Sequence, residues 1–185
     1  HWLDHVQLWS GEKHPKSVHS LAARHIKQDS TDAPDTQVVH YEFDDFFVTW
    51  EHRRYGGNDS EKHPIGIYFY GDKGIVHIGF HDGWTFYPTN ENAQIIHEPS
   101  QHHPPNEQNI KELWADFMAS IKSRQKPVCD IEIGHYSTNL SLLGMLSAKV
   151  GRKIFWDGEK EVVLNDPEAN TFLKREYRAP WVYPT

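Results

Sequence analysis

The sequence predicts an α+β fold, a two-layer sandwich in which helices cover one face of a mixed, largely antiparallel β-sheet. Two patterns carry this prediction. Alternating apolar and polar residues, typical of strands, fill much of the first half of the chain, whereas apolar residues three or four positions apart, typical of helices, fill the second half. A length of 185 residues suits one domain, so we expect residues 1–185 to form a single one.

Two hairpins are the clearest strand signals. Val39, Tyr41 and Phe43 alternate with polar residues before the turn at Asp44-Asp45, and the alternation resumes after it. A second pair of strands flanks the turn Gly71-Asp72-Lys73-Gly74, which favours a tight reversal of the chain. The predicted strands are residues 16–25, 37–43, 46–53, 65–70, 75–80, 84–87 and 154–156.

Helices are predicted mainly by an apolar face and by the residues at their ends. The strongest pattern follows Asn106 and stops before Pro127, with apolar residues that share one broad face. Gly151 suits the residue after a helix, and Asp166-Pro167 suits a helix start. The predicted helices are residues 1–10, 106–126, 133–150 and 166–174.

With helices on one side, the opposite face of the sheet would stay open. It would carry residues such as Tyr41, Trp50, Tyr68 and Tyr70, or their alternates along each strand. An exposed aromatic face of this kind is typical of an interaction surface. We therefore expect a homo-oligomer that assembles through the open sheet face.

Charge and composition exclude several classes of partner. Lys and Arg number 19 and Asp and Glu 26, giving a net charge of −7, which disfavours nucleic acid and anionic membranes. Cys129 is the only cysteine, so an internal disulfide and a cysteine zinc cluster are excluded. No apolar run is long enough for a membrane span. We expect a cytoplasmic protein, or a periplasmic one if its precursor carries a leader.

Several short strings, in this order and spacing, resemble the Gfo/Idh/MocA family of glucose-fructose oxidoreductase and inositol dehydrogenase, particularly its bacterial branch. The resemblance covers nearly the whole chain. The strings are His1-Trp2-Leu3-Asp4, Tyr68-Phe69-Tyr70-Gly71-Asp72-Lys73-Gly74, Ile131-Glu132-Ile133-Gly134-His135, Gly151-Arg152-Lys153-Ile154-Phe155-Trp156-Asp157, Glu168-Ala169-Asn170 and Tyr177-Arg178-Ala179-Pro180-Trp181.

The resemblance implies that residues 1–185 are the C-terminal substrate-binding and oligomerisation domain of a longer NAD(P)-dependent oxidoreductase. Neither the glycine-rich nucleotide loop nor the Glu-Lys-Pro motif of the family's N-terminal dinucleotide-binding domain occurs here. NAD or NADP would bind the parent protein, and not this chain alone. The substrate would be a sugar, polyol or related carbinol. Two alternatives stay open: a non-catalytic binding or oligomerisation module, and an NAD-dependent glycosidase of the same superfamily.

By the same resemblance, His1 matches a catalytic histidine that removes or relays the hydroxyl proton while hydride leaves the carbinol carbon. The family's acidic partner would lie just before the first residue. Asp4 is also a candidate for substrate contact, and it is expected to orient a neighbour or to cap a helix start. His135, expected near a helix N-terminus, and Trp84, whose ring can stack on a sugar, are the further candidates for substrate contact.

A metal site is the rival interpretation of the 14 histidines. His1, Asp4 and His5 share one face of the first predicted helix, at spacings that suit ligands, but no further ligand is tied to them by spacing. The other groups, His77 with His81 and the pair His102-His103, are expected to be solvated. We therefore expect no metal.

Overall fold

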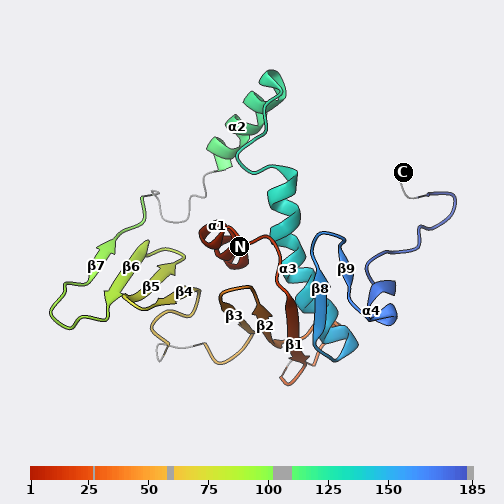
Figure 1. The fold of residues 1–185 in the computed structure, drawn as a ribbon, viewed down its shortest axis with the longest axis horizontal. Coiled ribbons are helices and arrows are strands. Elements are labelled where there is room, and N and C mark those ends of the chain that lie inside the picture. The colour runs from red at the N-terminus through yellow and green to blue at the C-terminus, as the bar shows by residue number, and fades with distance from the viewer. Residues whose placement is uncertain (27, 58–60, 102–109, 183–185) are drawn as a thin grey trace. The chain divides into compact units, whose positions relative to one another are not determined.

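The computed structural model describes residues 1–26, 28–57, 61–101 and 110–182. Helices and antiparallel sheets are both present, which confirms the predicted α+β class (Figure 1). The chain divides into two compact units. The first holds His1, Leu3–Gly56 and Glu132–Thr185, and the second holds Trp2 and Gly57–Ile131.

The first unit is built on a five-stranded sheet with the strand order β3-β2-β1-β8-β9, and each neighbouring pair is antiparallel. Four of its strands match predictions, and β9 was not predicted because two residues show no periodicity. The strands are β1 (Ser17–Ala23), β2 (Thr36–Glu42), β3 (Phe47–Arg53), β8 (Ile154–Asp157) and β9 (Val162–Val163).

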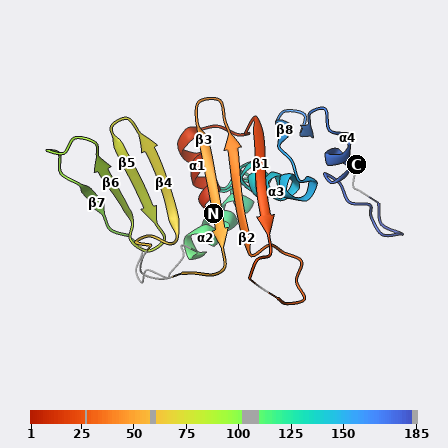
Figure 2. The ribbon, with the colours of Figure 1, turned by 90° about the horizontal axis from the view of Figure 1, so that it is seen from below.

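Three helices belong mainly to this unit: α1 (Trp2–Ser10), α3 (Ile131–Val150) and α4 (Pro167–Thr171). In Figure 2, α1 and α3 lie behind β1, β2 and β3, on the same side of the sheet. Leu140, Leu143 and Leu146 of α3 are buried, as are Val39 and Tyr41 of β2. These side chains form the core between helix and sheet.

The register of the strands fixes which residues face away from that core. Val18 lies opposite Tyr41, so these two share the covered face, while His19 and His40 lie opposite each other on the open one. Tyr41 was among the residues predicted for the open face; the structure buries it under α3, and its alternates along β2 face outward.

The second unit holds a separate four-stranded antiparallel sheet with the order β4-β5-β6-β7. The predicted single mixed sheet is therefore divided in two, and every described pair is antiparallel. The polar segment around Pro64 separates β3 from β4, and β7 is too short to show alternation. The elements are β4 (Gly66–Gly71), β5 (Gly74–Gly79), β6 (Trp84–Pro88), β7 (Ile96–Glu98) and α2 (Ile110–Ser123).

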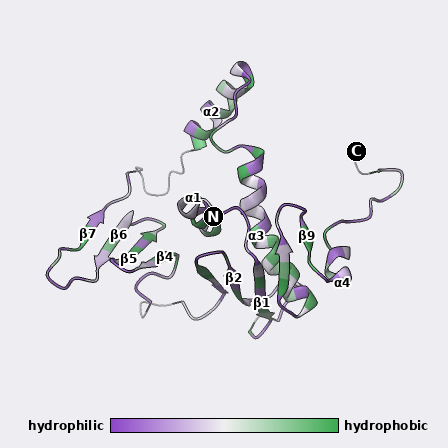
Figure 3. Cartoon of the chain, in the orientation of Figure 1, coloured by the Kyte–Doolittle hydropathy of each residue, from purple (hydrophilic) through white to green (hydrophobic). Residues whose placement is uncertain are grey.

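Helix α2 has the apolar face that its sequence predicts, yet none of its residues is buried. Hydrophobic and hydrophilic residues are mixed along it in Figure 3. No helix in the described part of the chain is both long and apolar enough to cross a bilayer.

Candidate functional site

His1 and Asp4 stand at the start of α1. His1 is exposed and occupies the N-cap position, but its side chain makes no capping hydrogen bond. Asp4 lies in the first turn, where a carboxylate interacts favourably with the helix dipole. The helix is anchored through buried Leu3 and Val6. Both predicted residues therefore project from a helix end whose position the core fixes.

The far end of α1 is tied to the beginning of α3. The side-chain amide of Gln7 donates to the main-chain carbonyl oxygen of Lys13 at 2.8 Å and to that of Tyr136 at 3.3 Å. Gly11, with a φ of 75°, ends the helix in the left-handed conformation that glycine adopts without strain. The chain then turns back toward α3, so residues 13 and 14 lie beside its first turns.

His135 contacts two polar side chains, and we call these three residues, His135, Asn139 and Glu161, the His135 cluster. Nε2 of His135 lies within hydrogen-bond distance of Oε1 of Glu161. The amide nitrogen of Asn139 lies 3.0 Å from the same Nε2 and 3.4 Å from the same Oε1. The cluster thus joins α3 to the turn between β8 and β9.

A second group of side chains lies next to this cluster. Tyr136 donates its hydroxyl to Glu132 at 3.1 Å, and this bond raises the pKa of Tyr136. The ammonium of Lys13 lies 3.5 Å from Glu132 and 5.1 Å from the centre of the Tyr136 ring. The imidazole of His14 meets that ring edge-on at 4.8 Å, and burial lowers the pKa of His14. An aromatic ring flanked by donors and acceptors is the kind of surface that contacts a hydroxylated ligand.

The structure corrects the expected setting of His135. Helix α3 begins at Ile131, two residues earlier than predicted, so His135 is its fifth residue. Its main-chain amide therefore lies past the unpaired amides of the first turn and cannot be offered to a ligand. Any contact must come from the imidazole.

Sequence reasoning missed the other members of the cluster. Asn139 follows His135 by four positions, the spacing at which side chains on a helix contact each other. Its contact with His135 could therefore have been predicted from the sequence. Glu161 lies 26 positions away and carried no local signal. Only the fold, which places the β8–β9 turn beside α3, brings it to His135.

Trp84 belongs to the second unit and is not grouped with the other candidates. It is an exposed residue of β6, opposite Ile78 on β5 and Glu98 on β7. Its predicted role as a stacking surface stays a prediction.

One prediction about the histidines was wrong. His77 was expected to be solvated, but it is buried, with its ring 3.9 Å from that of His63 and 4.6 Å from that of Tyr68, centre to centre. His102 and His103 lie outside the described residues. Within the described ranges, no three His, Cys, Asp or Glu side chains are grouped so that they can hold a metal ion.

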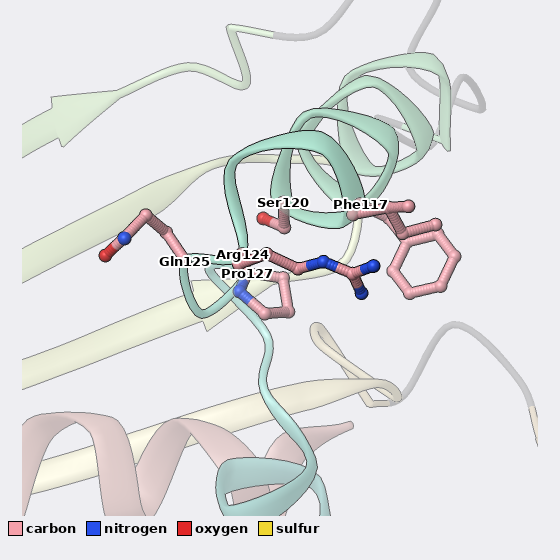
Figure 4. A pocket seen from close by; sticks show the side chains of 6 residues that line it. Phe117, Ser120, Arg124, Gln125 and Pro127 are labelled. Atoms are coloured by element: carbon pink, nitrogen blue, oxygen red, sulfur yellow. The ribbon is translucent and has the colours of Figure 1, made fainter.

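A hollow of about 260 Å³ lies at the C-terminal end of α2 (Figure 4). In this view the side chain of Arg124 extends toward Phe117, whereas Gln125 points to the other side. The hollow contains none of the predicted site residues. Its lining is Phe117, Ser120, Ile121, Arg124, Gln125 and Pro127.

Residues 1–183 match the Gfo/Idh/MocA group described as "Oxidoreductase family, C-terminal alpha/beta domain". The comparison with curated proteins found no match.

The solved structures with a similar fold include two dehydrogenases and an oxidoreductase. The WlbA dehydrogenase of Chromobacterium violaceum, in complex with NADH and UDP-GlcNAcA, is 18% identical, with a TM-score of 0.57 over 85% of this chain and 44% of that one. Its Bordetella pertussis namesake, with the same ligands, is 16% identical, with a TM-score of 0.51 over 85% and 43%. An Agrobacterium radiobacter oxidoreductase, in complex with NAD+, L-tartaric acid and magnesium, is 11% identical, with a TM-score of 0.58 over 83% and 46%. This chain spans less than half of each.

Proposed function

Because this chain belongs to the Gfo/Idh/MocA oxidoreductase family through its C-terminal α/β domain, we propose that it is the substrate-side domain of an NAD(P)-dependent enzyme. The parent enzyme oxidises or reduces a carbinol on a sugar, polyol or related small molecule. The match of residues 1–183 to the family is the observation that carries the proposal. The ligands of the similar structures, NADH with UDP-GlcNAcA and NAD+ with L-tartaric acid, agree in class with it.

The dinucleotide is held by another domain of the parent protein. This chain has no Gly-x-Gly-x-x-Gly loop, whose amides and close backbone approach a pyrophosphate requires. When bound to the parent enzyme, NAD or NADP would supply the hydride chemistry at the carbinol carbon. The residues of this chain bind the substrate and handle its protons.

His1 is the proposed catalytic residue. Loss of hydride from a carbinol carbon requires that the hydroxyl lose its proton, and an imidazole suits that transfer near neutral pH. Asp4, one turn further along α1, orients the neighbouring polar groups and stabilises the start of the helix. The exposed end of α1 leaves room for a substrate hydroxyl to approach His1.

His135 and Trp84 are the proposed binding residues. The imidazole of His135 offers a hydrogen bond to a substrate hydroxyl, beside the ring of Tyr136. Trp84 supplies a flat apolar face on which a sugar ring can stack. Each of the two residues is proposed to bind substrate, and neither is proposed to exchange its protons.

Oligomer formation is the second proposed role of the domain, and one observation favours it. The open face of the five-stranded sheet exposes large apolar side chains on three strands, Leu21 on β1, Phe47 on β3 and Phe155 on β8. Large apolar residues exposed on an uncovered sheet face are typical of an interface. A second copy of the chain is the proposed occupant.

The test uses an enzyme that contains this chain, screened against sugars and polyols with NAD and NADP, with nicotinamide absorbance as the readout. We expect His1→Gln to lower kcat by about 10²–10⁴-fold, the range for loss of a general base. His5→Gln, on the same helix, is the control and should leave kcat unchanged. Turnover by the 185-residue chain alone with added cofactor, or an unaffected His1→Gln enzyme, would contradict the proposal.

A further inference from the structure

Glu161 has an unfavourable backbone conformation. Its φ is 52°, in the left-handed region, at the end of the turn between β8 and β9. Glycine and asparagine occupy that region at little cost, whereas a side chain such as that of glutamate is strained there. A residue held in this conformation needs a compensating reason, and such strain is often found at functional sites.

The ion pair between Glu161 and His135 stabilises the fold too little to compensate for this backbone strain. The side chains of His135 and Glu161 are 46% and 45% exposed, and ion pairs at such exposed positions contribute little to the free energy of folding. A glycine at position 161 would relieve the strain and would lose almost no folding free energy from the ion pair. The carboxylate is therefore better explained by what it does to the imidazole.

A carboxylate only accepts hydrogen bonds, so its contact with Nε2 places the imidazole hydrogen on that nitrogen. The amide nitrogen of Asn139 lies 3.0 Å from Nε2 and 3.4 Å from Oε1 of Glu161, and with the imidazole hydrogen on Nε2 only the contact with Oε1 is a hydrogen bond. The carboxylate of Glu161 therefore sets this arrangement. The neutral imidazole then carries its lone pair on Nδ1.

We propose that Glu161 is the positioning residue of His135, an inference that rests on the proposed contact between His135 and the substrate. Glu161 fixes the ring orientation and keeps the hydrogen on Nε2, so that Nδ1 accepts a hydrogen bond from a hydroxyl of a sugar or polyol. Asn139 holds the carboxylate in place from the next turn of α3.

The first experiment measures the imidazole nitrogens by NMR in the ¹⁵N-histidine-labelled 185-residue chain. We expect ¹⁵N resonances of His135 that place the hydrogen on Nε2 in the original protein, and we expect this pattern to be lost in both Glu161→Gly and Glu161→Ala. Glu159→Gln, which removes an equal charge from the same turn, should keep it. Glu161→Gly should also raise the melting temperature, because glycine relieves the strain. Glu161→Ala removes the acceptor but keeps the strained backbone and therefore separates the two effects.

The second experiment measures KM and kcat in an enzyme that contains this chain. His135→Gln and Glu161→Gly should each raise KM about tenfold, the change expected for one lost hydrogen bond, and the double variant should match the single ones. A Nε2 resonance that survives in Glu161→Gly overturns the inference about Glu161. A lost resonance with an unchanged KM in His135→Gln overturns the proposed substrate contact of His135 instead.

Discussion

The phenolic hydroxyl of Tyr41 donates to the main-chain carbonyl oxygen of Leu140 at 2.9 Å and so links β2 to α3 inside the core. Tyr41 is only 1% exposed, and burial raises the pKa of its phenol, which keeps the hydroxyl a donor at every physiological pH. Gly144 follows one turn later. A Cβ at that position would lie 2.9 Å from the Tyr41 oxygen and 3.3 Å from two carbons of Val39. Helix and sheet therefore approach each other closely where a side chain is missing.

Gly144→Ala should destabilise the fold by about 1–3 kcal/mol, the usual cost of overpacking a core, although alanine is the better helix former by about 1 kcal/mol. Gly134→Ala is the matched control on the same helix. Nothing lies within 4 Å of its added Cβ, so that variant should gain about 0.5–1 kcal/mol. Urea unfolding measures both. Equal stabilities of the two variants would contradict the close approach of α3 to β2.

A second prediction concerns Arg152, which links the end of α3 to α4. Its Nε and Nη2 donate to the two carboxylate oxygens of Asp166 at 2.9 and 2.8 Å, and Nη2 also donates to Glu168 at 2.8 Å. Asp166 is the N-cap of α4 as well, accepting from the amide of Ala169 at 3.0 Å. These bonds, first the one from Arg152, lower the pKa of Asp166.

Asp166→Asn should lower the melting temperature, because asparagine keeps the cap but loses the charge that pairs with Arg152. Glu168→Gln is the control. The Glu168 side chain is 66% exposed against 15% for Asp166, so the control should lose less. Since the folded-state pKa is depressed, the contribution of Asp166 is present above its unfolded pKa of about 3.9 and is lost as pH falls through the folded value. A melting temperature of Asp166→Asn equal to that of the control would refute the assignment.

The sequence predicted strands and helices correctly where burial of one face makes apolar residues recur at regular spacing. Tyr41 and Val39 alternate with less buried residues because one face of β2 is covered, although Tyr41 was predicted for the opposite face. The leucines of α3 recur because one side of that helix packs on the sheet. Regular spacing could not predict the division into two sheets, because the order of strands depends on contacts between residues that are distant in the sequence. The contact between Glu161 and His135 could not be predicted for the same reason, because only the fold brings these two residues together.

A third prediction concerns pH and the buried His77. Burial lowers the pKa of His77, and the charge of neighbouring His63 acts in the same direction, with a smaller effect of Lys62; Asp82 opposes them. Tyr68 covers the ring from β4, and Nε2 of His77 has no hydrogen-bond partner among the described residues. The neutral imidazole is therefore the native form.

Below pH ~6.5 the unfolded chain takes up a proton at His77 before the folded chain does, so stability should fall as pH decreases through that value. His77→Leu, which keeps an apolar side chain of similar volume, should flatten this part of the profile. His63→Leu leaves His77 in place and should keep most of the slope. Urea unfolding between pH 8 and pH ~5 provides the measurement. An identical slope in His77→Leu would show that other groups control the acid response.

The last prediction tests assembly through the open sheet face. Leu21 and Phe47 are 69% and 81% exposed on that face, and in a symmetric dimer each patch meets its own copy. A Leu21→Lys/Phe47→Lys variant would bring like charges together there. Anchor residues of an interface contribute about 2 kcal/mol or more, so the dissociation constant should rise at least about 30-fold. Leu142→Lys/Met145→Lys, the same number of added charges at exposed positions of α3, should leave assembly intact. Sedimentation equilibrium measures the oligomeric state and the dissociation constant. An original protein that is monomeric, or a double variant that still assembles, would exclude this face as the interface.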